Sequence, residues 1–427
     1  MKKLVWNNLD SAQKASALMR PKLGYSEAIP EIVKDILTDV RKNGDTVVKN
    51  YTQKFDSVSL ENFEVSQNDK RELDSSICQA IETAYNNIKN FHAKQGYQKF
   101  TIETMDGISC SREVRTIERV GLYIPGGTAP LVSSTLMLGI PAQMAGCKSI
   151  IMCTPCDKNG EINPYIIFAA RLCGVQRIFS IGGAQAIAAM AYGTESVPKV
   201  DKICGPGNAY VTEAKQQIAR DPFGASIDMP AGPSEVCVIE DKTTNPSFAA
   251  ADLLSQAEHD VMSQVLLIST DEEILNATLQ EVDRQLANLP RRDIAAQAIK
   301  NSVAVISASM DEAIEISNDY APEHLILCFD AAQDYVTAVQ NAGSVFVGPW
   351  TPESAGDYAS GTNHVLPTYG YARTYSGLNV EAFQKTITVQ NISQQGLQNI
   401  GDCVETLANL EGLDAHARAI SIRRKAA

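Results

Sequence analysis

The stretch RIFSIGGAQAIAAM, residues 177–190, passes from a short apolar run through a glycine pair into a pattern typical of a helix. The same pattern of an apolar run, a glycine turn and a helical stretch recurs along the chain from Val120 onward. Strands that alternate with helices usually pair into parallel sheets covered on both faces, so this pattern predicts an α/β fold. Eight buried strands are predicted, at residues 149–153, 177–181, 200–204, 236–239, 265–268, 303–306, 325–329 and 345–347. This number suits two sheets, and we expect two Rossmann-like, doubly wound halves.

The two ends of the chain carry different patterns. The first hundred residues predict an N-terminal helical segment, with Pro30 in the first turn of a helix and Gly44 as its stop, and a longer amphipathic helix from about 70 to 92. Near the C-terminus a short strand at 386–389 is expected, followed by a helical region that Ser393 caps. Gly412 divides that region into 397–411 and 414–424. This tail is too small to fold alone, so we expect it to pack on another subunit or on its own body.

Composition limits the possible functions. The chain has 427 residues, 44% of them hydrophobic, and a formal net charge of -13. A chain of this size can bury a large core and divide into two or three domains. The negative charge would repel phosphate backbones, so nucleic acid is not an expected partner.

A cytoplasmic location without a membrane partner is expected. The start MKKLVWNNLD lacks the apolar core of a signal peptide, and no apolar stretch approaches the roughly 20 residues that span a bilayer. Ten cysteines are scattered without a dense framework, which fits reduced thiols. Cys153 and Cys156 have C-x-x-C spacing, but no second such pair completes a zinc site, so packing and a turn explain them better.

The segment PESAGDYASGTNHVLP, residues 352–367, is the first candidate site. It sets the carboxylate of Asp357 and the imidazole of His364 in a Gly- and Ser-rich stretch with little apolar content. Such a stretch does not form a core, so we expect its polar residues to face a ligand or an ion.

SQAEHD, residues 255–260, offers possible metal ligands. Gln256 and His259 stand three apart on a helix that Asn245 caps and Pro246 opens, so both are expected on one face near its C-terminal end. With Asp357 and a further imidazole they could form an N/O site for a borderline metal such as zinc. The alternative is a surface helix end at which His259 interacts with the carbonyls.

In YAPEHLIL, residues 320–327, Glu323 and His324 precede a predicted buried strand and form a candidate acid/base pair. Neighbouring residues on a regular strand would point to opposite faces. The pair therefore requires the irregular backbone that Pro322 favours, and a structural role remains equally open.

Three glycine segments could approach a ligand: YIPGGTAP at 123–130, IGGAQA at 181–186 and GPGNAY at 205–210. The second and third follow strands and open helices, so their amides could meet an anion. None matches G-x-G-x-x-G, and spacing alone does not predict a dinucleotide. IDMPAGPSEV, at 227–236, offers the hydroxyl of Ser234, but the absence of G-x-S-x-G disfavours a serine hydrolase.

In this order, IDMPAGPSE, LLSQAEH, PEHL and SAGDYASGTNHVLP resemble the histidinol dehydrogenase family over essentially the whole chain. The resemblance implies oxidation of L-histidinol to L-histidine through L-histidinaldehyde, the last steps of histidine biosynthesis. It also implies two NAD and one Zn2+ per site, a homodimer, and a fold similar to aldehyde dehydrogenases.

The resemblance also implies a role for each matching residue. Glu323 would activate water in the second oxidation, and His324 would be the general base of the first. The metal would orient the substrate, and its ligands would be Gln256, His259, Asp357 and, from the neighbouring subunit, His416. Substrate contacts would come from Ser234, Gln256, His259, His324, Asp357, His364, Glu411 and His416. NAD contacts would come from Tyr123, Gln185 and Asn208.

No nucleophilic cysteine is needed in this scheme, and Cys328, the nearest to the motifs, is expected in the core.

Four domains are expected: an N-terminal segment at 1–23, a first α/β domain of 24–118 with 236–318, a second, NAD-binding one of 119–235 with 319–370, and a dimerisation tail at 371–427. Two rival functions remain. A zinc hydrolase would use the same ligands and Glu323 without a dinucleotide, and a binding protein would hold the metal only for structure.

Overall fold

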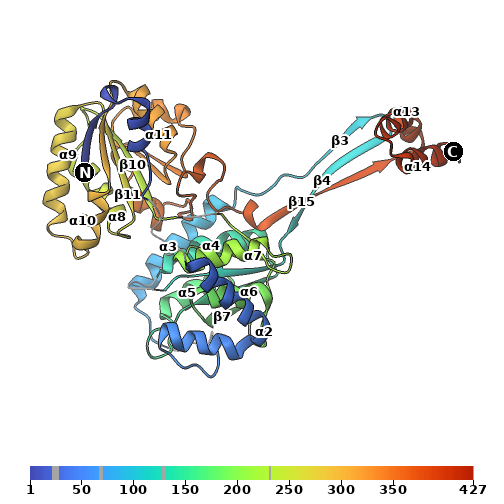
Figure 1. Ribbon diagram of the computed structural model, residues 1–427, viewed down its shortest axis with the longest axis horizontal. Helices are drawn as coiled ribbons and strands as arrows, with labels where there is room; N and C mark the ends of the chain where they lie inside the picture. Colours follow the sequence, from blue (N-terminus) through green and yellow to red (C-terminus); the bar gives the residue numbers. More distant parts are fainter. Residues whose placement is uncertain (22–27, 67–70, 127–130, 230–231, 427) are drawn as a thin grey trace. The chain divides into compact units, whose positions relative to one another are not determined.

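The computed structural model describes all residues except 22–27, 67–70, 127–130, 230–231 and 427. The chain divides into two compact units (Figure 1). The first unit comprises Met1–Lys94 and Glu118–Asn379, and the second comprises Gln95–Ile117 and Val380–Ala427. No helix in the described part of the chain has the length and apolar character needed to cross a membrane.

Within the described residues, the first unit contains two six-stranded sheets. The spatial order of one is β2 (Glu64–Val65), β7 (Arg177–Ser180), β6 (Ser149–Thr154), β5 (Arg119–Tyr123), β8 (Lys202–Cys204) and β9 (Ser226–Ile227). Its neighbouring strands are parallel, except that β2 is antiparallel to β7. The chain winds from β5 to one side and then from β8 to the other, so the order reverses between these two strands. That reversal is the place where doubly wound sheets usually bind ligands.

Helices cover both faces of this sheet. One face carries α2 (Ile29–Asp56), α6 (Gly183–Tyr192) and α7 (Ala209–Arg220), which share one core with Tyr123, Ile151 and Phe179. Leu122 points the opposite way along β5, toward Gly139 of α4 (Val132–Ala145). Two further helices pack beside α4, namely α3 (Ser75–His92) and α5 (Pro164–Leu172). The predicted stop at Gly44 is a break inside α2, where φ is 53°, and the helix resumes beyond it.

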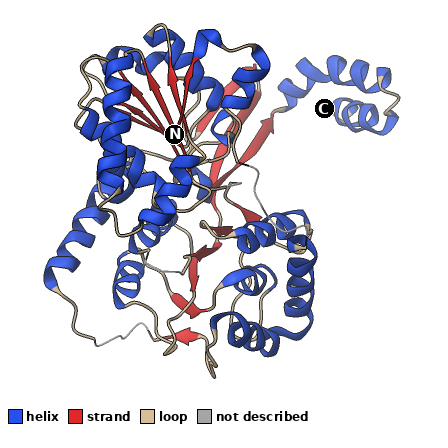
Figure 2. Ribbon diagram, turned by 60° about the vertical axis from the view of Figure 1, so that its left-hand side comes forward, coloured by secondary structure: helices blue, strands red, loops and turns tan. Residues whose placement is uncertain are grey.

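The other sheet of the first unit has the same winding. Its spatial order is β1 (Lys2–Val5), β12 (Val303–Ile306), β11 (Gln264–Ser269), β10 (Glu235–Glu240), β13 (His324–Leu327) and β14 (Ser344–Val347), all parallel. Val236 and Val238 face a core with α8 (Pro246–Ala257), α9 (Glu272–Leu286) and α10 (Arg292–Lys300). Cys237 and Ile239 alternate to the opposite face, which α11 (Met310–Tyr320) covers. Figure 2 shows the resulting layers of helix, sheet and helix.

Shorter elements complete the first unit. They are η1 (Trp6–Asn8), α1 (Ser11–Ala17), η2 (Ala332–Ala338), α12 (Glu353–Tyr358) and η3 (Tyr371–Arg373). Asp10 caps α1 with a reciprocal capping box, and Asn245 and Pro246 open α8 as the sequence predicts.

The second unit is a three-stranded antiparallel sheet followed by two helices. The strands lie in the order β15 (Gln384–Ile392), β4 (Ile108–Thr116) and β3 (Phe100–Met105), and η4 (Glu381–Phe383) leads into β15. The helices are α13 (Gln394–Leu410), which Ser393 caps, and α14 (Asp414–Lys425). The predicted cap and the predicted division at Gly412 are therefore confirmed.

The predicted fold class is confirmed. All eight predicted strands exist, and their ends differ from the prediction by at most two residues. The predicted grouping of 236–318 with 24–118 differs from the sheet pairing, because β10 pairs with β13 and that places 319–370 in the same sheet as 236–318. Likewise, α2 packs in one core with residues of 119–235.

Candidate active site

The candidate site forms at the amino end of β10 and β13, two neighbouring strands that come from distant parts of the chain. Val236 pairs with His324, so Glu235 lies beside the start of β13. The backbone N–H of Glu235 donates to Oε2 of Glu323 at 2.9 Å. Its carbonyl lies 3.1 Å from Nδ1 of His324, which donates to it. One backbone position thus fixes both members of the predicted acid/base pair.

The backbone before β13 is irregular, as this pair requires. Ala321 has a φ of 54°, in the left-handed region, and Pro322 follows it. The strand begins only at His324, so Glu323 is free of the strand's alternation. Its Oε2 lies 3.6 Å from Nδ1 of His324, and both side chains are buried.

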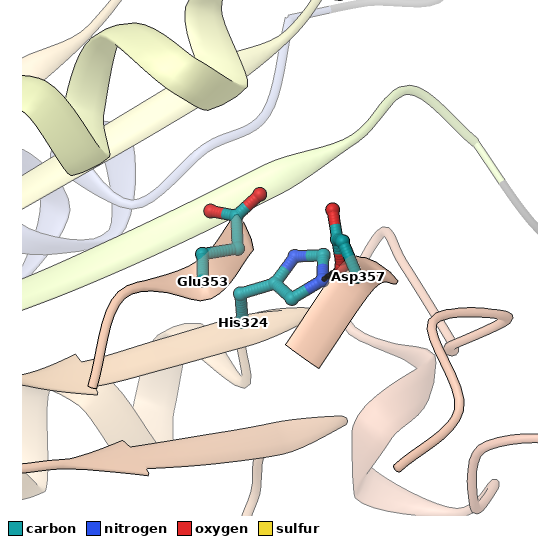
Figure 3. A group of neighbouring side chains, drawn as sticks. All are labelled: His324, Glu353 and Asp357. Carbon is teal, nitrogen blue, oxygen red and sulfur yellow. Dashed lines mark ion pairs between the residues drawn. The ribbon is translucent and has the colours of Figure 1, made fainter. Parts of the chain in front are cut away.

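The short helix α12 brings two carboxyl groups to the same imidazole. His324, Glu353 and Asp357 each offer one ligand atom within 4.8 Å of the others, and Figure 3 shows the ring between the two carboxyl groups. Nε2 of His324 lies 3.4 Å from Oδ1 of Asp357. Sequence reasoning missed Glu353. The signal that could have found it is the spacing of four residues to Asp357, which puts both on one helix face.

Gln256, in the last turn of α8, is fully buried beside this group. When its amide nitrogen faces Glu353, it donates to Oε1 of Glu353, and its oxygen accepts from the N–H of Glu235 at 3.2 Å. His259 lies beyond the end of α8, which corrects the prediction that it stands on the helix. His259 reaches the surface, as the surface alternative expected. The protein packed around its ring nevertheless lowers its pKa, and the charge of Asp357 opposes this only in part.

Burial and charge shift the pKa values of the cluster in opposite directions. Burial raises the pKa of both Glu323 and Glu353 to about 8. Burial alone would lower the pKa of His324, but the surrounding carboxyl groups outweigh it and raise that pKa well above its ordinary value. For Asp357, burial acts upward, but the ion pair with His324 and the charge of the other nearby imidazoles bring its pKa below the ordinary value. Asp357 is therefore the carboxylate most firmly held in its charged form.

The cluster also contacts α4, one of the helices that cover the sheet containing β5. Nδ1 of His364 donates to the carbonyl of Asp357 at 2.9 Å. Its Nε2 lies 3.4 Å from Oγ of Ser134, in the first turn of α4. Burial lowers the pKa of His364, so its ring is held neutral between these partners. Ser134 carries no sequence motif, and only the fold brings it here.

The donor set fits a divalent cation. Nε2 of His324 and Oε2 of Glu353 are buried and make no hydrogen bond to any described residue. Buried polar atoms without partners are uncommon and costly, so they indicate a place where a ligand or an ion binds. Imidazole and carboxylate are ligands that zinc accepts, with an amide oxygen as a weaker one.

The three predicted NAD contacts lie at the carboxyl ends of β5, β7 and β8. The hydroxyl of Tyr123 accepts from the N–H of Gly183 at 3.0 Å. Gln185 is buried, and both of its amide atoms lack hydrogen-bond partners among the described residues. Asn208 caps α7 by accepting from the N–H groups of Tyr210 and Val211, 3.1 Å in each case. They lie on the edge where the strand order reverses.

The remaining predicted residues stand apart from the described cluster. Ser234 is half-buried and directly precedes Glu235. Glu411 follows α13 and His416 lies on α14, so both belong to the second unit, where they are exposed. Their part in the site stays a prediction. Residues 127–130 of the first glycine segment and 230–231 of IDMPAGPSE lie outside the described residues.

Comparisons with known proteins agree with the sequence motifs. The sequence model of the family described as histidinol dehydrogenase matches residues 19–424. The chain is 49% identical over 427 residues to histidinol dehydrogenase of Vibrio parahaemolyticus, covering 99% of this chain and 98% of the relative. It is 50% identical over 428 residues to the chloroplastic histidinol dehydrogenase of Arabidopsis thaliana, covering 100% and 92%.

Solved structures give the same result. The crystal structure of histidinol dehydrogenase from Elizabethkingia anophelis matches with a TM-score of 0.95 and 49% identity, covering 100% of this chain and 98% of that one. A structure of proline utilization A matches with a TM-score of 0.51 at 12% identity, covering 89% and 44%, which is a likeness of fold alone. On the match of nearly its whole length, the chain belongs to the histidinol dehydrogenase family, the oxidoreductases of histidine biosynthesis.

Proposed function

We propose that this protein oxidises L-histidinol to L-histidine through L-histidinaldehyde, with reduction of two NAD. The observation that carries the proposal is the buried pair of Glu323 and His324, fixed by one backbone position beside Asp357. An alcohol oxidation needs a base for the hydroxyl proton, and an aldehyde oxidation needs a second base for water. The pair offers both.

In the first oxidation His324 accepts the hydroxyl proton of the substrate. The carboxyl groups raise the pKa of His324, and the charge of a bound cation would oppose that effect and favour the neutral ring. Because Nδ1 donates to the carbonyl of Glu235, the neutral ring carries its lone pair on Nε2. That nitrogen makes no other hydrogen bond to the described residues and is available to the alcohol. The hydride leaves the same carbon for NAD, which gives the aldehyde, NADH and one proton.

In the second oxidation Glu323 accepts a proton from water, and the resulting hydroxide adds to the aldehyde carbon. The hydrate then loses a hydride to a second NAD, and the oxygen from water becomes part of the carboxylate. A pKa of about 8 for Glu323 lies close to the range in which a carboxyl group can take up and release a proton near neutral pH.

Gln256, His259, Asp357 and the partner subunit's His416 are the proposed ligands of Zn2+. When bound, the ion would supply a fixed charge that orients the substrate nitrogens and offsets the carboxylates around His324. This role keeps the aldehyde in the site between the two oxidations without a covalent link to the protein. Ser234, His364 and Glu411 would complete the contacts with the substrate.

NAD would bind at the carboxyl edge of the sheet around β5, against Tyr123, Gln185 and Asn208. The support is their shared position at the reversal of strand order and the unpaired amide of Gln185. His364 contacts both Ser134, near this edge, and the carbonyl of Asp357. These two contacts support a short distance between the proposed NAD site and Asp357.

A homodimer with shared sites is part of the proposal. The second unit exposes apolar side chains that a monomer would be expected to bury, including Ile102, Ile387 and Leu410. A cytoplasmic location is proposed on the ten cysteines, all of which are free thiols.

Absorbance of NADH tests the proposal. Purified, zinc-loaded protein should reduce two NAD for each histidinol consumed and should yield histidine. No NADH with histidinol would overturn it. A zinc hydrolase would turn over its substrate without NAD. The membership in the histidinol dehydrogenase family disfavours that alternative.

A further inference from the structure

We propose that Arg20 is a positioning residue that fixes Glu323 and His324 for the chemistry, acting through Glu235. This inference rests on the proposed function of that pair. Arg20 lies in no motif that the sequence points to, and it does not touch the two catalytic side chains. Its importance comes from the backbone that it holds.

Arg20 forms a buried, two-pronged ion pair with Glu235. Nε donates to Oε1 of Glu235, and Nη2 donates to Oε2 at 2.8 Å. Only 10% of the Arg20 side chain and 2% of the Glu235 side chain are exposed. Bidentate pairs of this kind fix orientation as well as charge. Glu235 is the same residue whose N–H and carbonyl hold Glu323 and His324.

The same guanidinium also holds the second segment that leads into the site. Nη2 of Arg20 donates to the carbonyls of Tyr320 at 2.8 Å and of Ala321 at 3.2 Å. Its guanidinium carbon lies 4.1 Å from the centre of the Tyr320 ring. Ala321 is in the left-handed conformation, which costs a non-glycine residue free energy and persists only when its surroundings hold it. Glu323 follows two residues later.

Tyr369 closes the arrangement around the same carboxylate. Its N–H donates to Oε1 of Glu235 at 3.0 Å, and its hydroxyl donates to the carbonyl of Pro21, directly after Arg20. Tyr369 also has a positive φ, 58°. Two residues with a positive φ and four chain segments, at 20–21, 235, 320–321 and 369, therefore meet at one ion pair.

Loss of Arg20 should move the acid/base pair rather than remove it. A buried charge without its partner is strongly unfavourable, so Glu235 would shift or admit water. Displacement of about 1 Å at a reacting group can slow a step by about 100-fold. The substrate-binding and metal-binding side chains on α8 and α12 do not touch Arg20 in the described structure.

The test compares Arg20→Met with Arg177→Met in full-length, zinc-loaded protein. Arg177 makes an ion pair with Glu64 of the same geometry but at a more exposed position. Its Nε and Nη2 donate to the Glu64 carboxylate at 2.9 and 2.7 Å, Nη2 also donates to the carbonyl of Ser196 at 3.0 Å, and the guanidinium carbon lies 5.0 Å from the centre of the Phe179 ring. That pair joins β2 and β7 and does not contact Glu235. We expect Arg20→Met to lower kcat by roughly 10- to 100-fold with KM for histidinol within about threefold, and Arg177→Met to leave both near wild type.

Two further variants keep the test decisive if Arg20→Met does not fold. Arg20→Lys keeps the positive charge but cannot make the two parallel hydrogen bonds of the guanidinium to Glu235. Its kcat should therefore lie between those of the Arg20→Met variant and the wild-type protein, which is a partial rescue of kcat by charge alone. The double variant Arg20→Met with Glu235→Met should regain stability over the single variant while kcat stays low. An unchanged kcat in Arg20→Lys, or a loss confined to KM, would overturn the positioning role. Failure of the wild-type protein to make NADH would instead overturn the proposed function.

Discussion

Glu353 and Asp357 lie one turn apart on α12, yet the pKa values of their carboxyl groups move in opposite directions. Burial raises that of Glu353 to about 8. For Asp357, burial acts upward, but the ion pair with His324 and the charge of the other nearby imidazoles hold the pKa below its ordinary value. Near neutral pH the cluster therefore contains one carboxyl group that readily keeps its proton and one that does not.

This difference predicts unequal effects on metal binding. Asp357→Asn removes the proposed charged ligand, so zinc affinity should fall at least 100-fold. Glu353→Gln is the matched control, because it keeps a neutral group in the same cluster, and its loss should stay within about tenfold. Competition with a chelator measures both affinities. Equal losses for the two variants would contradict the assignment of Asp357 as the ligand.

Replacement of Glu323 should separate the two oxidations. Glu323→Gln removes the proposed base for water, so oxidation of the aldehyde should slow by about 100- to 10,000-fold while oxidation of the alcohol slows far less. The variant should make close to one NADH per histidinol in a single turnover, instead of two, and should release or retain the aldehyde.

Glu240→Gln is the control for this variant. Glu240 is also a buried carboxyl group in the same sheet, but it lies at the opposite end of β10. Its replacement should leave the yield at two NADH. A yield of two for Glu323→Gln as well would remove Glu323 from the water step.

Glu240 also predicts how stability depends on pH. Burial raises its pKa from 4.5 to about 7, and one oxygen, Oε1, has no hydrogen-bond partner among the described residues. Below pH 4.5 both folded and unfolded chains hold the proton, and the stability contribution is complete. As pH rises toward 7 the unfolded chain ionises first, so the free energy of unfolding falls, by up to about 3 kcal/mol at pH 8.

Glu240→Gln removes this titration but keeps the acceptor for Thr278, whose hydroxyl lies 2.8 Å from Oε2. The free energy of unfolding of the variant, relative to wild type, should therefore be higher at pH 8 than at pH 5. Urea denaturation at the two pH values measures it. Parallel pH profiles for the two proteins would show that Glu240 ionises normally in the folded state.

A buried lysine should control affinity for NAD. Nζ of Lys215 donates to the carbonyl of Gly205 at 2.8 Å and to Asp228, which in turn accepts from the N–H of Gly205 at 2.7 Å. Gly205 has a φ of 134°, and a Cβ there would clash with the carbonyl oxygen of Tyr123. The pair thus holds the turn that leads to Asn208. Lys215→Met should raise KM for NAD about tenfold and leave KM for histidinol nearly unchanged.

Lys199→Met is the control, because Lys199 also donates to a backbone carbonyl, that of Phe223, but at an exposed position. Its kinetic constants should match those of wild type. A rise in KM for histidinol equal to that for NAD in Lys215→Met would mean that the substitution disturbs the whole site.

Buried strands could be predicted from the sequence because burial on both faces demands a continuous apolar run. Most of the predicted strands have such a run, and all eight have a glycine or polar turn after it. The predicted strand 200–204 contains Asp201 and Lys202, and its observed start, at Lys202, is two residues later than predicted. The strand Phe100–Met105 is exposed along its whole length, and apolar and polar residues alternate within it. It therefore lacks the continuous apolar run that marks a buried strand. The prediction of a helical first hundred residues fails there for this reason.

Side chains inside motifs were predicted, but their partners were not. Glu323 and His324 are adjacent in the sequence, whereas the residue that fixes them, Glu235, is 88 positions before Glu323. Its role depends on the register of β10 against β13, which no local pattern encodes. Arg20 and Ser134 depend on the same long-range pairing. The predicted domain grouping differs from the sheet pairing for the same reason, since strand pairing decides which segments share a sheet.

His416 gives the sharpest test of a site shared between subunits. His416→Ala and Asp357→Asn chains should each be nearly inactive and bind zinc weakly, while Ser421→Ala, a control on the same helix, should behave as wild type. When the two inactive chains are refolded together in equal amounts, half of the dimers are mixed. Each mixed dimer then holds one site with an intact Asp357 from one chain and an intact His416 from the other, so activity should return to about one quarter of wild type. If His416 acted within its own chain, every site would lack one ligand and the mixture would stay inactive.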